Sequence, residues 1–173
     1  MVEIKIFPLI GIEIEGIGTI KLGHEKAEVE KVLGYPTTIY GSQCFYDDYE
    51  FRIDYDKSDK IEFIEFIYGP FPEKSKLSVY NINPFLVGAE NLINLLTNQN
   101  NGEIDESEAE YCYAFKEISV GIFREATEKD IEEMMSEMKE RGEYEENKNW
   151  IVEDLEKSKN FWTIGIGIKN YYR

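Results

Sequence analysis

The side chains that most often carry chemistry are scarce in this sequence, which has one histidine, His24, and two cysteines, Cys44 and Cys112. One histidine cannot build a two-histidine metal site or a multi-histidine cluster, and no His-x-Glu deaminase motif is present. A catalytic triad would need His24 beside a nucleophile and an orienting acid. Because His24 lies at the start of a predicted short helix, we expect it instead to be exposed and to cap that helix.

Carboxylates are so numerous that their presence alone identifies no acid and base pair. Asp54, Asp56 and Asp59 alternate like EF-hand ligands, but the central glycine and the late glutamate of that loop are missing from the required frame. Gly165 and Gly167 lack the third glycine, the following helix and the Lys-Ser or Lys-Thr pair of a nucleotide site. We therefore predict a protein that is not an enzyme, with no catalytic residue, no metal site and no cofactor.

The two cysteines occupy nearly equivalent places in two similar stretches of the chain. We predict that Cys44 and Cys112 are buried free thiols in strands, as is common for cysteine. A disulfide would need an oxidising compartment, which nothing else in the sequence indicates. Whether the two thiols lie close together in space is left open.

The sequence has 35 acidic and 19 basic residues, a net charge of -16. This charge disfavours binding to nucleic acid or to an anionic membrane surface and favours a basic protein partner. The alternative is that the acidity only keeps the protein soluble. No run reaches the roughly 18 apolar residues of a membrane helix. The first residues lack the pattern of a signal peptide, so we expect a cytoplasmic protein of undetermined oligomeric state.

Two segments of the chain share the order β-α-β-β-β, and residues 45–53 match residues 112–120 in their apolar pattern. The pattern predicts an α+β fold in which duplicated β-α-β-β-β units form an antiparallel sheet with short helices packed on one side. The first unit has an opening segment at 18–24, helix 25–33 and strands 42–46, 49–55 and 60–68. The second has strand 77–82, helix 87–96 and strands 111–115, 118–124 and 161–169.

Two prolines and a glycine within residues 70–76 and just before them predict a linker between the units. The first unit then covers residues 1–69 and the second residues 77–173, within one compact domain. Whether the two units share one continuous sheet is left open.

An inserted acidic helix is predicted at about residues 127–142, in the second unit. Thr127 supplies a cap, and the apolar residues recur at helical spacing, namely Ile131, Met134, Met135 and Met138. Residues 125–146 hold ten acidic residues and three basic ones. In one interpretation a methionine-rich seam packs this helix on the sheet, and in the other the helix is exposed and docks a basic partner.

A charged loop at residues 103–110 precedes the next predicted hairpin. Together with the inserted helix it supplies the most acidic surface that the sequence predicts. We expect the partner-binding residues to be Glu103, Asp105, Glu106, Glu108, Glu110, Glu132, Glu133, Glu137, Tyr144 and Glu145.

Two short stretches resemble known families. Residues 17–36, which begin Ile-Gly-Thr-Ile-Lys-Leu-Gly-His and end Leu-Gly-Tyr-Pro, resemble the opening of BamE-like and β-lactamase-inhibitor-protein-like units. The closing Thr-Ile-Gly-Ile-Gly-Ile-Lys-Asn-Tyr-Tyr at residues 163–172 is similar to the end of small acidic bacterial proteins that serve as immunity partners of polymorphic toxins. The lipoprotein signal of BamE is missing. The resemblance implies a tandem scaffold that binds another protein, and it assigns no site residue in this sequence.

Our first hypothesis is therefore an immunity protein that binds and neutralises a bacterial toxin domain through its acidic surface. The alternative is a housekeeping interaction or small-ligand module without a toxin partner, which would use the concave sheet between the units. A third, enzymatic hypothesis rests on the carboxylates alone.

Overall fold

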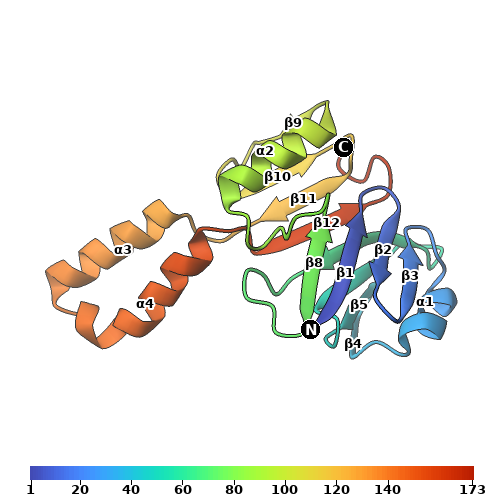
Figure 1. Cartoon of the computed structure of the whole chain (residues 1–173), viewed down its shortest axis with the longest axis horizontal. Helices are drawn as coiled ribbons and strands as arrows, with labels where there is room; N and C mark the ends of the chain where they lie inside the picture. The colour runs from blue at the N-terminus through green and yellow to red at the C-terminus, as the bar shows by residue number, and fades with distance from the viewer.

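Stretches of alternating apolar and polar residues form the strands of two β-sheets, as the computed structural model of residues 1–173 shows (Figure 1). The larger sheet is antiparallel throughout, with strand order β4-β5-β6-β7-β12-β11-β10-β9. Its strands are β4 (Thr38–Tyr40), β5 (Gln43–Tyr46), β6 (Phe51–Tyr55), β7 (Ile61–Phe66), β9 (Ile104–Asp105), β10 (Cys112–Phe115), β11 (Val120–Phe123) and β12 (Thr163–Gly167).

The smaller sheet has four strands in the order β3-β2-β1-β8. Strands β1 (Val2–Phe7), β2 (Gly11–Ile14) and β3 (Gly18–Lys21) form a meander, and β8 (Ser75–Val79) pairs with β1 in parallel. The sequence analysis did not assign β1 and β2. Because β8 lies beside β1, the chain returns across the linker to complete this sheet.

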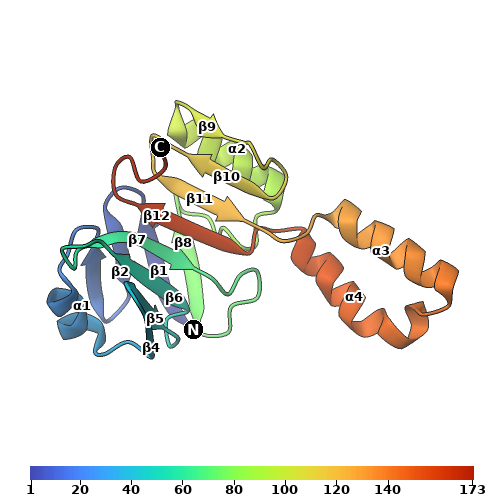
Figure 2. The same cartoon turned by 180° about the vertical axis from the view of Figure 1, so that it is seen from behind.

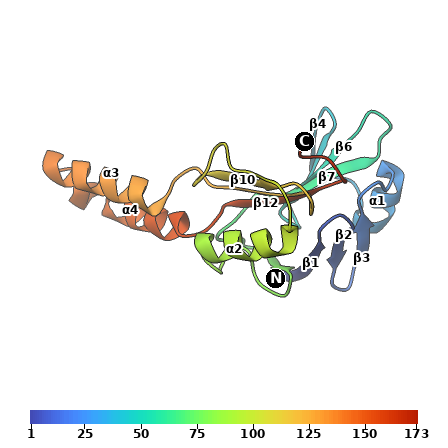
Figure 3. The ribbon, with the colours of Figure 1, turned by 90° about the horizontal axis from the view of Figure 1, so that it is seen from above.

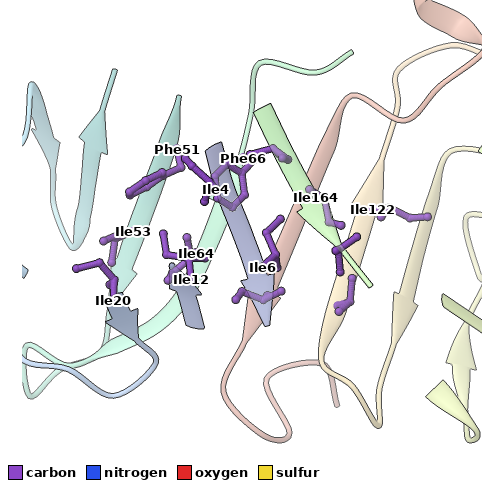
Figure 4. Close-up of a cluster of buried hydrophobic side chains, with 14 of the residues drawn as sticks. Ile4, Ile6, Ile12, Ile20, Phe51, Ile53, Ile64, Phe66, Ile122 and Ile164 are labelled. Carbon is purple, nitrogen blue, oxygen red and sulfur yellow. The ribbon is translucent and has the colours of Figure 1, made fainter. Parts of the chain in front are cut away.

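The core lies between the two sheets. In the close-up of Figure 4, isoleucines from the small sheet, such as Ile4 and Ile12, lie over Phe51, Ile64 and Phe66 of the large sheet. All five side chains are at most 1% exposed, so this interface is dry and closely packed. Strands from both predicted units contribute to the same core, which answers the open question of a shared sheet: there is one continuous sheet of eight strands.

The helices are α1 (Lys26–Leu33), α2 (Ala89–Asn100), α3 (Glu128–Arg141) and α4 (Tyr144–Ser158). Leu92 and Leu96 of α2 are fully buried and belong to the same core cluster as the sheets. The cap of α1 is Glu25, which forms a capping box with Glu28. The capping role expected for His24 is therefore wrong: His24 lies just before the cap, is half-buried, and accepts a bond from the Lys21 backbone N–H at 3.3 Å.

The inserted helix predicted at residues 127–142 is confirmed as α3, with Thr127 as its cap and Gly142 at its end in a left-handed conformation. The chain then forms a second helix, α4, which was not predicted. Helices α3 and α4 pack on one another as a hairpin that extends outward from one end of the large sheet (Figures 1, 2 and 3). We call residues 128–158 the arm and the rest of the molecule the body. The interpretation of a methionine seam packed on the sheet is wrong, because α3 packs on α4 instead of on the sheet.

The strand order of the large sheet is symmetric about its central pair, β7 and β12. Strands β6, β5 and β4 follow on one side, and β11, β10 and β9 follow on the other. This order is what two similar units joined at their last strands would produce. The duplication itself stays a prediction.

Candidate partner-binding surface

The base of the arm is fixed to the body by Arg124, which follows β11. The guanidinium Nε donates to the carbonyl oxygen of Glu110 at 2.7 Å, and Nη1 donates to the carbonyl oxygen of Ser158 at 3.0 Å. The same guanidinium lies 5.0 Å from the centroid of the Phe161 ring. One side chain thus connects the acidic loop, the end of α4 and the core of the body.

A second connection starts from the capping box of α3. The Asp130 carboxylate accepts bonds from the Thr127 backbone N–H and hydroxyl, both at 2.8 Å, and from the Tyr111 hydroxyl at 2.9 Å. The hydrogen bonds from Thr127, followed by the one from Tyr111, lower the pKa of Asp130. Because Tyr111 directly follows the loop at residues 103–110, the start of α3 is held against that loop.

The arm has a thin apolar seam of its own. Ile131 of α3 and Ile151 of α4 are its only nearly or fully buried apolar side chains, at 4% and 0% exposure. Other apolar side chains of the arm remain exposed: Met134 is 40% exposed, Trp150 is 43% exposed and Val152 is 41% exposed. The arm therefore presents apolar surface that the fold itself does not cover.

The arm is also strongly acidic, with twelve acidic and five basic residues in positions 128–158. Some acids pair within their own helix, as Glu133 does with Lys129 at 3.9 Å and Glu137 with Arg141 at 3.6 Å. These pairs are exposed to solvent and contribute little to stability. Glu132 and Glu145 form no ion pair.

The predicted partner-binding residues divide into three groups. Glu103 pairs with Lys116, and Asp105 accepts a bond from the Ser107 backbone N–H at 3.0 Å, which lowers its pKa. These two residues therefore support the local turn. The second group lies at or near the base of the arm, and the third lies toward its tip (Figure 1). The second group is Glu106, Glu108, Glu110, Glu132 and Glu133, and the third is Glu137, Tyr144 and Glu145.

Tyr144 is less available than its prediction implied. It is half-buried, and the Lys139 ammonium lies 4.7 Å from the centroid of its ring. The sequence analysis missed Trp150, which is exposed on α4. The apolar spacing of Tyr144, Ile151 and Leu155 could have indicated that helix.

The outer face of the large sheet, away from the core, is covered in part by the C-terminus. The Tyr171 ring stacks on Phe63 with centroids 4.6 Å apart, and Tyr172 lies directly over Gly121. A Cβ atom at Gly167 would overlap the Tyr171 side chain. The strand glycines therefore leave space on this face of the sheet, and the C-terminal tyrosines of the same chain occupy it.

Beside these tyrosines lies a small ionic group. Arg52 pairs with Asp54 at 3.1 Å and with Glu65 at 3.0 Å. Burial raises the pKa of Glu65, although the Arg52 charge opposes that effect. Each carboxylate has a cationic partner, so the group is satisfied within the fold.

The cysteines occupy the predicted strands, Cys44 in β5 and Cys112 in β10, and both are free thiols. Cys44 is buried as expected, but Cys112 is only partly buried. Strands β6, β7, β12 and β11 lie between them, so the two thiols are not neighbours.

The alternating aspartates hold local structure. Asp54 pairs with Arg52, and the Asp56 carboxylate accepts bonds from the backbone N–H groups of Ser58 at 2.7 Å and Lys60 at 3.0 Å. No group of three or more His, Cys, Asp and Glu side chains is placed to hold a metal ion. None of the helices has the length and apolar character needed to cross a bilayer.

The surface that the geometry favours is thus the acidic end of the molecule, where the loop at residues 103–110 meets the base of the arm. Comparison of the chain with protein-family models, with curated proteins and with solved structures gave no match.

Proposed function

We propose that this protein is a non-enzymatic binding scaffold that docks a basic protein through its acidic arm and the adjoining loop. The observation that carries the proposal is the projection of an acidic helical hairpin from the sheet body, with its base bonded to an acidic loop through Arg124 and Tyr111. A negative surface of this kind attracts a positively charged partner and speeds its encounter at low ionic strength.

In its specific form the proposal is an immunity protein of the cytoplasm, which binds a toxin domain and covers the basic site where that toxin holds a nucleic acid or phosphate substrate. The resemblance of residues 163–172 to immunity proteins supports this form. The symmetric strand order supports a tandem scaffold, as the resemblance of residues 17–36 implies.

The test compares two variants with the same change in charge. The first carries Glu108→Gln, Glu132→Gln and Glu145→Gln at the acidic end, and the control carries Glu13→Gln, Glu15→Gln and Glu117→Gln elsewhere on the body. All six residues are exposed, and none forms an ion pair or a side-chain hydrogen bond. Each immobilised protein is exposed to lysate of the native organism at low and high salt, and retained proteins are identified by mass spectrometry.

We expect wild type and the control variant to retain the same basic protein at low salt. With the purified pair, the acidic-end variant should bind about 5- to 30-fold more weakly, since exposed charge pairs each contribute up to about 1 kcal/mol. If the partner is a toxin, wild type should block its activity at one-to-one stoichiometry. Retention of no protein at either salt, or equal loss of affinity in both variants, would contradict the proposal.

A further inference from the structure

Trp150 lies on the surface of α4, among acidic neighbours. Its indole N–H donates to the Asn147 side-chain oxygen at 2.8 Å, so its polar atom already has a partner within the helix. Residues three and four positions away are surface neighbours on a helix. For Trp150 these include Glu146, Glu153 and Asp154, which places three carboxylates beside the ring.

The other large aromatic side chain of the arm shows what such a ring can hold. Tyr144 is occupied by Lys139, whose ammonium lies 4.7 Å from the ring centroid. Two more rings in the body are covered in the same way, Tyr55 by Lys26 and Phe161 by Arg124. Trp150 has no cation over its ring, although tryptophan binds cations more strongly than tyrosine or phenylalanine.

The fold does not account for the exposure of Trp150. The buried contacts of the arm seam are made by Ile131 and Ile151, and the Trp150 ring remains 43% exposed. Alanine is a better helix former than tryptophan, so the helix does not need this residue. Tryptophan is, however, the residue type most enriched at the energetic centres of protein interfaces, together with tyrosine and arginine.

We infer that Trp150 and its flanking carboxylate Glu146 receive an arginine or lysine side chain of the basic partner, an inference that rests on the proposed function. The cation lies over the indole ring and pairs with Glu146. Glu153 contributes less, because Lys157 already pairs with it at 2.8 Å. A second copy of this chain is a poor occupant, because two arms would bring like charges together.

The first experiment uses a nona-arginine peptide as the probe, with a nona-citrulline peptide of equal length and no charge as its control. The chain has two tryptophans, so the indole N–H signals of Trp150 and Trp162 can be followed separately by NMR, with Trp150→Phe for assignment. We expect nona-arginine to shift the Trp150 signal and to leave Trp162 nearly unchanged, because the Trp162 side chain is half-buried and lies outside the proposed contact with Glu146. Nona-citrulline should shift neither signal. An unmoved Trp150 signal overturns the inference.

The second experiment uses the basic protein retained by the wild type. Trp150→Ala should weaken binding about 2- to 5-fold, or more if the contact is desolvated, and Trp150→Phe should be intermediate. The control is Tyr35→Ala, which removes an aromatic side chain that is 86% exposed. Tyr35 follows α1, which lies at the opposite end of the molecule from the arm (Figure 1). Circular dichroism verifies that each variant keeps its helices.

The outcomes separate the two proposals. If the acidic-end variant loses affinity and Trp150→Ala does not, the inference fails and the proposed function stands. If neither variant loses affinity, both fail. A dimer of this chain that depends on Trp150, detected by light scattering, also overturns the inference.

Discussion

The body and the arm differ in how their apolar side chains are buried. The body has one continuous core of 27 buried residues, drawn from both sheets, α1 and α2. The two buried isoleucines of the arm, Ile131 and Ile151, do not belong to that core. Burial of apolar area is the main stabilising contribution in folding, so the two regions should differ widely in stability.

This difference indicates that the body and the arm have different roles. Hydrogen bonds of Arg124 and Tyr111 hold the base of the arm to the sheet body, while the arm carries charged and exposed apolar side chains. Elements that bind partners are often drawn from the less stable parts of a structure. Mutations in each region test this comparison. A mutation in the core of the body should destabilise the whole molecule, whereas a mutation in the arm should destabilise the arm alone.

The largest effect is expected from Phe66→Ala in the body. Phe66 is 1% exposed and its ring contacts Phe51 edge to face, with centroids 5.4 Å apart. Truncation of a buried phenylalanine costs about 3–5 kcal/mol, because it leaves a cavity. Urea unfolding should show this loss for the whole chain, with sheet and helix signals changing together. A loss below about 1 kcal/mol would show that the body core is not the principal source of stability.

A smaller and local effect is expected from Ile151→Ala in the arm. It should destabilise the hairpin by roughly 2–4 kcal/mol, which is enough to unfold a two-helix element with so thin a seam. Hydrogen exchange should then show loss of protection in residues 128–158, while the body keeps its protection. The neighbouring Val152→Ala is the matched control, because Val152 is 41% exposed and its truncation should change stability by less than about 0.5 kcal/mol.

Equal loss of protection in the body and the arm of Ile151→Ala would break the comparison. The two regions would then unfold as one cooperative unit, and the arm could not be described as a separate element.

The sequence predicted the elements whose signals are local. Helix α3 was placed correctly because Thr127, the apolar spacing from Ile131 and the terminal Gly142 all lie within one short stretch. The hairpin of β6 and β7 was placed for the same reason, since its turn and both alternating strands are contiguous. Free cysteines in strands and the α+β class also followed from pattern and composition.

The sequence analysis did not predict strands β1, β2, β4 and β9 or helix α4, and two physical reasons account for β1, β2 and α4. Strands β1 and β2 alternate as strands do, but β1 also pairs with β8, more than 65 residues later, and no local signal specifies that partner. The N-cap residue of helix α4 is Glu143, which makes no side-chain capping bond, and most of the surface of α4 is polar. The placement of the arm outside the body could not be predicted, because it depends on bonds between Arg124 and residues distant in the chain.

For the candidate binding surface, the sequence predicted the acidic loop at residues 103–110 and helix α3. It did not predict that the two are in contact. That contact needs Tyr111 and Asp130 to meet, which is a property of the folded sheet. Trp150 was missed together with its helix.

The smallest expected effect is the pH dependence of the Asp130 capping box. It tests the contact between the body and the arm. Hydrogen bonds from Thr127 and Tyr111 hold the folded-state pKa of Asp130 below its ordinary value of 3.8. A carboxylate of this kind stabilises the fold above its unfolded pKa, and the contribution is lost as the pH falls through the folded pKa. The arm should therefore loosen below about pH 4, as followed by helical circular dichroism and hydrogen exchange.

Asp130→Asn isolates this contribution. The asparagine keeps the size of the side chain but cannot ionise, so the variant should be less stable by about 0.5–1.5 kcal/mol at neutral pH and should lose no further stability from this group in acid. The other carboxylates of the arm are common to both proteins, so the comparison isolates Asp130. The difference between wild type and Asp130→Asn should therefore shrink as the pH falls below 4. A constant difference down to pH 2 would mean that the charge of Asp130 does not hold the arm to the body.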